Sequence, residues 1–485
     1  MNKIALSIFL AILTTGMLYS QNEVDALRYA RTVPGGTARY MSMGGAFGSL
    51  GADFSTISSN PAGLGLYKKS EFTITPAFYM GSTKSEYNGN STDDSQSNFN
   101  LSDVGFVLNT KTENPIFKNF QFSFGLVRTN NFNNRIYIAG ENNENSIMTA
   151  YADDATGISP VDLDNNEYPF DLSPAWWTYM INPDPNCEGF CYTDTLPAGT
   201  NLRQRKEINS WGSMNEYTFG FSTSIGDRLY LGTSIAFPRI RYFEESRYTE
   251  TNLDDESSAF RELTIYDDLE TKGTGINLKF GMILRLTNFI RLSGAIHSPT
   301  WYNNMNDSWY NSHSTEFVGN SFYEQSPYGN FSYELETPWR AIGGVSLVLW
   351  RAVLLSADYE FVDYSKSKFR SDGYDFYDEN SSISNNYTKT HNARIGTEFR
   401  FGHFAMRAGF GYNMSPYADN INDGEKFTYS GGMGFRDENF FLDLAYVRSE
   451  THEEYYLYGS ENVNVKPANN KLITNNLLLT LGFRY

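Results

Sequence analysis

The sequence predicts an all-β fold: an antiparallel transmembrane β-barrel of about fourteen strands with an N-terminal hatch in its lumen. Three observations predict this fold. The chain begins with a secretory leader, its later segments alternate apolar residues with small or polar ones, and the links between these segments are tight and long in turn. Alternation with a period of two places successive side chains on opposite faces of a strand.

The composition agrees with strands around a polar lumen. Aromatic residues make up 16% of the 485 residues and there are 40 glycines, yet the mean hydropathy is −0.45. The formal charge of −18 excludes a nucleic-acid partner, because binding to phosphates needs a basic face. The two cysteines and five scattered histidines form no metal-binding or hydrolase motif. We therefore expect no metal, no cofactor and no enzymatic activity.

Residues 1–20 are the first element. Lys3 precedes an apolar run from Ile4 to Leu13, and small and polar residues follow as far as Ser20. This order is typical of a secretory signal peptide, with cleavage after Ser20. The apolar run is too short to span a bilayer as a helix, so we expect an exported chain without a helical anchor.

Residues 21–69 are the second element, and they do not alternate. Their glycines at positions 45, 48 and 51 are spaced as in some nucleotide-binding loops, but no strand precedes them and no Gly-Lys-Ser/Thr motif follows. Small residues at this density allow a segment to pack closely against a wall of strands. We therefore predict that residues 21–69 form a plug inside the barrel.

Residues 70–485 are the third element, the barrel. Phe120, Phe122 and Phe124 alternate with polar or small residues, and the same pattern recurs in residues 276–286 and 404–412. Tight links alternate strictly with long polar ones, which we predict to be loops; residues 82–97 are the first of these and residues 132–207 the longest. In outer-membrane barrels, short turns lie on the periplasmic side and long loops lie outside. This parity predicts an even number of strands and places both termini in the periplasm.

The last strand ends in Phe483 and Tyr485, on the same face as the leucines before them. An aromatic carboxy-terminal residue on such a strand is similar to the signal that barrel-assembly machinery recognises. The alternative is an ordinary amphipathic strand that happens to be the last one.

Two further sets of residues have alternative interpretations. Cys187 and Cys191 lie in the longest loop and, in an exported chain, are expected to form a local disulfide rather than remain two free thiols. Arg394, Arg400 and Arg407 fall on inward-facing positions of the predicted strands. We expect them to form ion pairs with lumenal carboxylates, and each is also a candidate to bind a ligand carboxylate.

Several motifs resemble, in order along the chain, those of the FadL/TodX family of outer-membrane transporters for hydrophobic compounds. They are Asn60-Pro61-Ala62 after a glycine-rich stretch, His297-Ser298-Pro299-Thr300, Thr337-Pro338-Trp339, residues 358–365, residues 407–412 and Ser415-Pro416-Tyr417. The resemblance implies a fourteen-stranded barrel and a lumenal hatch marked by Gly44, Gly45, Asp53, Asn60, Pro61 and Ala62. The long acidic loops resemble those of the Bacteroidetes branch.

The resemblance also implies a function. We expect passive uptake of hydrophobic or amphipathic small molecules, similar to long-chain fatty acids, by a monomer in the bacterial outer membrane. Its expected partners are this ligand, outer-membrane lipid, lipopolysaccharide and the barrel-assembly machinery. The alternative is a barrel that binds another protein, or serves secretion, through its long loops.

Overall fold

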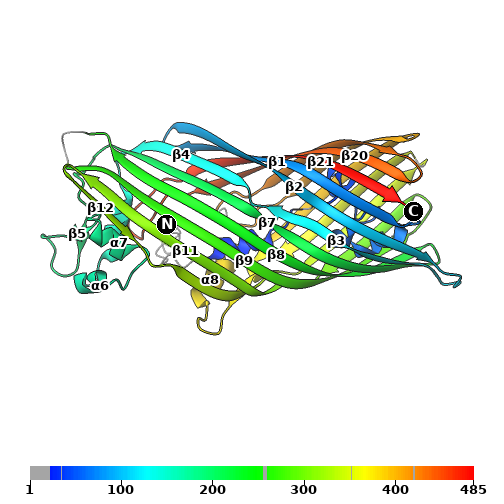
Figure 1. Cartoon of the computed structure of the whole chain (residues 1–485), viewed down its shortest axis with the longest axis horizontal. Helices are drawn as coiled ribbons and strands as arrows, with labels where there is room; N and C mark the ends of the chain where they lie inside the picture. The colour runs from blue at the N-terminus through cyan, green and yellow to red at the C-terminus, as the bar shows by residue number, and fades with distance from the viewer. Residues whose placement is uncertain (1–21, 34, 255–258, 351, 419–420) are drawn as a thin grey trace, which may run out of the picture.

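The computed structural model describes residues 22–33, 35–254, 259–350, 352–418 and 421–485. The predicted signal peptide, residues 1–20, lies outside the described residues. Figure 1 shows a long barrel of tilted strands, with short helices in its interior and at one end. In the described part of the chain, no helix is long and apolar enough to cross a lipid bilayer.

The barrel is a closed antiparallel sheet of 14 strands, as predicted. Some strands are interrupted once or twice and then continue beside the same neighbour. The strands are, in chain order, β1 (Glu71–Tyr87), β2 (Asn90–Lys111), β3 (Phe117–Asn131) continued by β4 (Asn134–Asn142), β7 (Leu202–Ile225), β8 (Leu229–Asn252), β9 (Phe260–Arg285), β10 (Ile290–His297) continued by β11 (Trp301–Phe317), β12 (Asn320–Gln325) continued by β13 (Gly329–Glu336) and β14 (Arg340–Leu349), β15 (Val353–Asp363) continued by β16 (Lys368–Arg370), β17 (Lys389–Phe401), β18 (Phe404–Asn413), β19 (Lys426–Arg436), β20 (Phe440–Tyr455) and β21 (Ala468–Arg484).

The last strand closes the barrel against the first. β21 pairs with β1 from Glu71↔Arg484 to Glu86↔Asn469, and the Arg484 Nε donates to Glu71 Oε2 at 2.8 Å. The backbone of Tyr485 exchanges two hydrogen bonds with Ser70. Closure removes the sheet edges, whose unpaired backbone groups would be costly in lipid.

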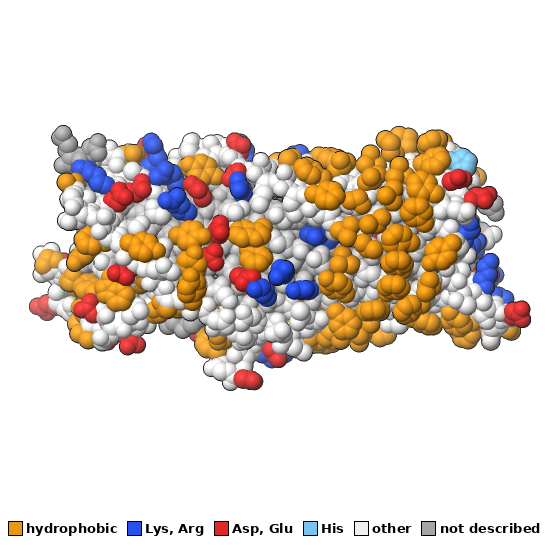
Figure 2. Space-filling view, viewed as in Figure 1, with side chains coloured by type: hydrophobic (Ala, Val, Ile, Leu, Met, Phe, Trp, Pro, Cys, Tyr) orange, Lys and Arg blue, Asp and Glu red, His pale blue; other side chains and the backbone are white. Residues whose placement is uncertain are grey.

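The two faces of the sheet differ as the alternation predicts. Outward-facing residues such as Phe122, Phe219 and Phe280 are exposed, whereas the residues between them are small or polar and face the lumen. On the face seen in Figure 2, outward apolar side chains cover the half of the barrel that carries the tight turns. We call this surface the apolar belt. Beyond the belt, the same strands continue with a polar outer face.

This continuation corrects the predicted loops. Residues 82–97 were expected to form a loop, but β1 and β2 run on to a turn at Asn88 and Gly89. Residues 132–207 also contain strand: β4 covers Asn134–Asn142 and β7 begins at Leu202, so the connection is residues 143–201. The physical reason is that a strand outside the membrane needs no apolar outer face, so the period-two pattern fades before the strand ends.

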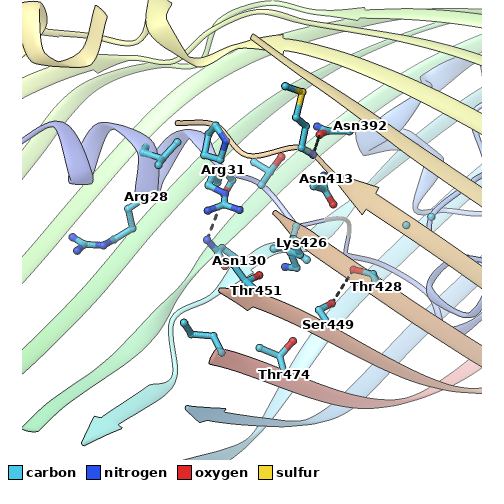
Figure 3. Close-up of a pocket in the computed structure, with 18 of the residues that line it drawn as sticks. Arg28, Arg31, Asn130, Asn392, Asn413, Lys426, Thr428, Ser449, Thr451 and Thr474 are labelled. Carbon is cyan, nitrogen blue, oxygen red and sulfur yellow. Dashed lines mark hydrogen bonds between the residues drawn. The ribbon is translucent and has the colours of Figure 1, made fainter. Parts of the chain in front are cut away.

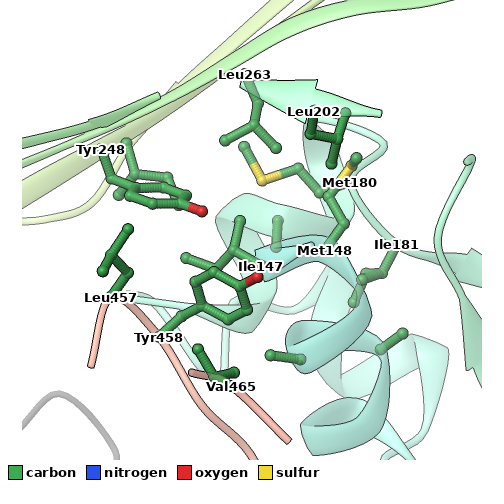
Figure 4. Packing of buried hydrophobic residues seen from close by; sticks show 14 of the residues in the cluster. Ile147, Met148, Met180, Ile181, Leu202, Tyr248, Leu263, Leu457, Tyr458 and Val465 are labelled. Carbon is green, nitrogen blue, oxygen red and sulfur yellow. The ribbon is translucent and has the colours of Figure 1, made fainter. Parts of the chain in front are cut away.

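Residues 143–201 form a packed structure that we call the cap. It contains α5 (Ile147–Ala155), α6 (Pro160–Asp164), α7 (Leu172–Trp177) and a short hairpin of β5 (Asn182–Pro183) and β6 (Tyr192–Thr193). Cys187 and Cys191 are joined by a disulfide in the connection between β5 and β6. Figure 4 shows Ile147 and Met148 of the cap packed near Tyr248 and Leu263 of the wall.

A buried carboxylate attaches the cap to the wall. Glu250 of β8 accepts hydrogen bonds from the Ile147 backbone N–H at 2.9 Å, from Gln204 Nε2 at 2.9 Å and from the Tyr248 hydroxyl at 2.6 Å. Ile147 is the first residue of α5, where unpaired N–H groups favour a negative charge. The orientation of α5 is therefore set by the barrel wall.

Candidate binding site in the barrel lumen

Residues 22–33 and 35–69 lie inside the barrel, and we call them the hatch segment. Its helical elements are α2 (Glu23–Ala30), α3 (Ala38–Ser42), α4 (Thr56–Ser59) and the 3-10 helix η2 (Pro61–Leu66). Figure 1 shows these elements surrounded by the strands. Most of their side chains are buried, including apolar residues such as Phe47 and Phe54.

Glycines of the wall allow the hatch segment to approach the strands closely. A Cβ added to Gly232 of β8 would lie 2.3 Å from the backbone carbon of Pro61. A Cβ on Gly409 of β18 would lie 2.2 Å from the backbone nitrogen of Gly44. Real Cβ atoms do not approach backbone so closely, so the small residues of the hatch segment meet equally small residues of the wall.

Each residue of the Asn60-Pro61-Ala62 motif has a distinct contact. The Asn60 Nδ2 donates to the carbonyl of Gly48 at 2.7 Å and to that of Met282 in β9 at 3.3 Å. The Asn60 Oδ1 accepts from the Ala62 N–H at 3.1 Å and so caps η2. Pro61 is the first residue of η2, where a missing N–H costs nothing. The motif thus joins a turn within the hatch segment to the barrel wall.

The other predicted hatch residues stabilise turns. The Asp53 carboxylate accepts from the Thr37 hydroxyl at 2.9 Å and from the Ser55 N–H at 3.1 Å. Gly44 and Gly45 have φ angles of +65° and +76°, in the left-handed region that favours glycine. These contacts account for the residue types at the three positions.

A buried network of charges links the hatch segment to three strands. The Arg39 Nε lies 3.0 Å from Glu398 Oε2, and the Arg407 Nε lies 2.6 Å from the same oxygen. Arg407 also pairs with Asp443 at 2.6 Å, and Arg400 pairs with Glu398 at 2.6 Å. The ion pairs that the sequence predicted for Arg400 and Arg407 are present. Neither arginine lines the main cavity of the lumen.

A second group of polar and charged residues contacts the hatch segment from β10, β15 and β17, next to the first group. The Gly48 N–H donates to Asp358 at 2.7 Å, and His297 Nε2 lies 2.8 Å from the carbonyl oxygen of Ser59. Arg394 pairs with Glu360 at 3.2 Å. Inward polar and charged residues of β10 and β15 therefore contact the hatch segment, and those of β15 and β17 pair with one another.

The main cavity lies between the hatch segment and the outer half of the barrel, and we call it the lumenal cavity (Figure 3). Its volume is about 380 Å³. Apolar side chains from the hatch segment and the strands form much of its lining: Val24, Leu27, Val33, Met41, Phe132, Met414, Val447 and Leu472. A largely apolar lining that also presents a small set of polar and charged groups is typical of small-molecule sites.

Four cations line the lumenal cavity, and three of them have carboxylate partners. Arg28 pairs with Asp25, Arg31 with Glu453 at 3.7 Å, and Arg394 with Glu360. The side chain of the fourth, Lys426, forms no ion pair or hydrogen bond with another described residue. Figure 3 shows Lys426 beside Arg31 in the same part of the cavity. The cavity therefore carries one cation in excess.

Of the three candidate arginines, the structure places only Arg394 on the lumenal cavity. Sequence reasoning missed Lys426 and Arg31. Lys426 is the first residue of β19, directly after a polar loop, so its face of the strand was not recognised. In β19 the residues with even numbers, such as Gly432 and Gly434, face the lumen, and Lys426 lies in the same series. This alternation is the signal that could have identified Lys426. Arg31 follows α2 in the hatch segment, where no alternation exists to assign a direction.

The motifs around His297 and Thr337 interrupt strands at a second, smaller cavity of about 80 Å³. β10 ends at His297 and β11 begins at Trp301, while β13 ends at Glu336 and β14 begins at Arg340. Lys279 pairs with Glu216 there at 2.5 Å. Arg394 lines this cavity as well as the lumenal cavity, and it therefore lies between the two.

Comparisons with known proteins concern the fold. No protein-family model and no curated protein matches the sequence. A FadL homologue of Pseudomonas aeruginosa is similar in structure, with a TM-score of 0.57 and 14% identity over 94% of this chain and 99% of that one. The toluene transporter TodX of Pseudomonas putida gives a TM-score of 0.54 with 12% identity over 93% and 99% of the two chains.

The monoaromatic hydrocarbon channel CymD gives a TM-score of 0.51 with 12% identity, over 93% of this chain and 99% of that one. These solved structures are matched along 99% of their length, and the matches cover 93–94% of this chain. The resemblance drawn from the sequence motifs is therefore confirmed in the architecture: this chain has the barrel fold of the FadL/TodX channels.

Proposed function

We propose that this protein is an outer-membrane channel for the passive uptake of hydrophobic and amphipathic small molecules, and that its ligands include monocarboxylates of the fatty-acid type. The observation that carries the proposal is the lumenal cavity, in which apolar walls surround one cation in excess. The known FadL/TodX-type channels of the same fold, named for toluene and monoaromatic hydrocarbons, support the apolar part of this ligand class.

The physical basis is complementarity to an amphipathic anion. A hydrocarbon chain against Leu27, Phe132 and Leu472 is removed from water at a gain of about 25 cal/mol per Å² of buried surface. A carboxylate beside Lys426 and Arg31 relieves the repulsion between two neighbouring cations and gains charge-assisted hydrogen bonds. A neutral hydrocarbon would gain only the first contribution.

The hatch segment has the role of a plug in this proposal. It fills the lumen on one side of the cavity, and its α2 contributes Leu27 and Arg28 to the lining. A bound ligand therefore contacts both the wall and the hatch segment, so a shift of the segment changes the site. With both termini in the periplasm, the hatch segment would separate the lumenal cavity from that compartment.

Lys426 provides the test of the ligand class. Replacing it with glutamine is expected to weaken the binding of dodecanoate by about 10-fold to 100-fold, the effect of losing one hydrogen bond to a charged group. The binding of dodecanol is expected to stay unchanged, because the apolar walls remain. Isothermal titration of the detergent-solubilised protein with both ligands measures the two affinities.

Lys111 is the matched control, since it is exposed at the end of β2 outside the lumenal cavity. The Lys111→Gln variant should bind both ligands as the wild type does. Equal dodecanoate affinity in the Lys426→Gln and wild-type proteins would refute carboxylate binding at this site. Failure of wild-type vesicles to take up either ligand would refute transport itself.

The second candidate function is that of a protein-binding barrel. The observation that favours it is the cap, which is a packed structure rather than an open loop and exposes Val161, Tyr179 and Phe190. Pull-down from envelope membranes with wild-type protein distinguishes the two functions. A stoichiometric protein partner that is lost when the cap is deleted favours protein binding, and a co-purified lipid favours transport.

A further inference from the structure

The outer wall of the barrel has a groove where three neighbouring strands are irregular at the same height. Pairing between β8 and β9 passes from Ala236↔Asn277 directly to Arg239↔Thr274, since Pro238 has no N–H to donate. The register of β11 shifts between Tyr302 and Asn304. The resulting wall groove has a volume of about 370 Å³ and is lined by Tyr217, Phe237, Pro238, Arg239, Thr274, Gly275, Ile276, Trp301, Asn303 and Asn304.

One side of the wall groove belongs to the apolar belt. Tyr217 and Phe237 are 45% and 41% exposed on the outer face, and they are direct partners in the pairing of β7 with β8. Ile276 is paired with Trp301 on the neighbouring strands. Aromatic side chains of this kind mark the level at which a bilayer changes from hydrocarbon to headgroups. The wall groove therefore lies at that boundary.

The other side of the wall groove is cationic. Arg239 lines the groove. Two residues farther along β8, Arg241 is the direct cross-strand neighbour of Lys272 in β9. Figure 2 shows lysine and arginine side chains gathered at the edge of the apolar belt, on the face formed by β7, β8 and β9. Three positively charged side chains thus lie within two residues of one another along neighbouring strands, in a chain whose formal charge is −18.

Arg239 and Arg241 differ from several other exposed cations of the barrel, which pair with carboxylates. Lys84, Arg203 and Lys466 pair with glutamates at 3.1, 3.5 and 2.5 Å. Lys272 likewise pairs with Glu270 at 2.6 Å. In the described part of the chain, however, Arg239 and Arg241 have no carboxylate partner. Two guanidinium groups at the headgroup level are therefore available to an anion from the membrane.

We propose that the wall groove binds a phosphorylated glycolipid of the outer leaflet, with lipid A as the chemical class. Its acyl chains would lie on Phe237, Ile276 and Trp301, and its phosphate would meet Arg239 and Arg241, whose planar guanidinium groups bind phosphate with two hydrogen bonds. The amides of Asn303 and Asn304, which line the groove, are suited to sugar hydroxyl groups. The inference rests on the proposed outer-membrane location and is independent of transport.

The test is competition between two lipids for the full-length protein. Nanodiscs that contain equimolar lipid A and phosphatidylglycerol are extracted, and native mass spectrometry counts the lipids retained by the protein. We compare the wild type with the variant Arg239→Gln/Arg241→Gln. Retention of lipid A by this variant is expected to fall about 25-fold, because each unpaired cation near a membrane surface contributes about fivefold.

A second double variant, Lys84→Gln/Lys466→Gln, changes the formal charge by the same amount at cations that already have partners, and should retain lipid A. Equal retention by the two double variants would overturn the proposal. Equal retention of phosphatidylglycerol and lipid A by the wild type would also overturn it, since the groove would then attract any anionic lipid. Dodecanoate binding of the first variant stays at the wild-type level, which separates this site from the lumenal cavity.

Discussion

Replacing Glu398 with glutamine is expected to lower the free energy of unfolding by about 3–5 kcal/mol, the cost of removing one partner from a buried ion pair. The Glu398 carboxylate is fully buried and meets Arg39, Arg400 and Arg407. Without its charge, the guanidinium groups of Arg39 and Arg407 remain buried near each other, and Asp443 is their one remaining ion-pair partner among the described residues. Urea unfolding of the refolded protein in lipid vesicles measures the change.

The hatch segment should respond more strongly than the barrel in this variant, since Arg39 is its buried ionic link to β17. Limited proteolysis is therefore expected to cleave within residues 35–69 before it cleaves the strands. Glu113→Gln is the control, because Glu113 is exposed in the turn between β2 and β3. A similar loss of stability in both variants would show that the network contributes nothing beyond general charge effects.

Replacing Gly232 with alanine is expected to displace the hatch segment while the barrel stays folded. The new methyl group would lie 2.3 Å from the Pro61 carbonyl carbon and 2.4 Å from the Ala62 nitrogen. Both atoms belong to the backbone, so no change of rotamer relieves the contact, and overpacking of this kind costs about 1–3 kcal/mol. Ion conductance through planar bilayers is expected to rise, because the plug no longer fits the wall.

Gly294 is the matched control, since it lies in β10 and an added Cβ there would have no atom within 4 Å. Gly294→Ala should conduct as the wild type does. A protein that lacks residues 22–66 sets the upper limit of conductance. Wild-type conductance in the Gly232→Ala variant, together with wild-type stability, would contradict a hatch that is held by close packing.

The sequence was most informative where a single physical rule acts on every residue of an element. Membrane lipid demands an apolar outer face and complete backbone pairing, so the alternation around Phe120 and the tight turns such as Gly226-Asp227-Arg228 predict the number and direction of the strands. The rule weakens outside the membrane. For that reason the polar half of β2 and all of β4 were predicted to be loop.

The candidate site was predictable in part. The alternation in β17 predicts that Arg394 faces the lumen, and the small residues of the hatch segment predict close packing. The inward direction of Lys426 can be predicted only once the start of β19 is known, and no periodic pattern predicts the direction of Arg31. The wall groove depends on irregularities in β8, β9 and β11 that meet only because of the register between these strands.

Sequence alone was therefore sufficient for the fold class, the strand count and the tight-turn end of the barrel, because each follows from local alternation and turn chemistry. Tertiary structure was needed to show which wall glycine faces Pro61, which carboxylate neutralises Arg407 and which cation of the cavity has no partner. These contacts join residues far apart in the chain. Barrel closure and strand register decide them, and no local pattern encodes either one.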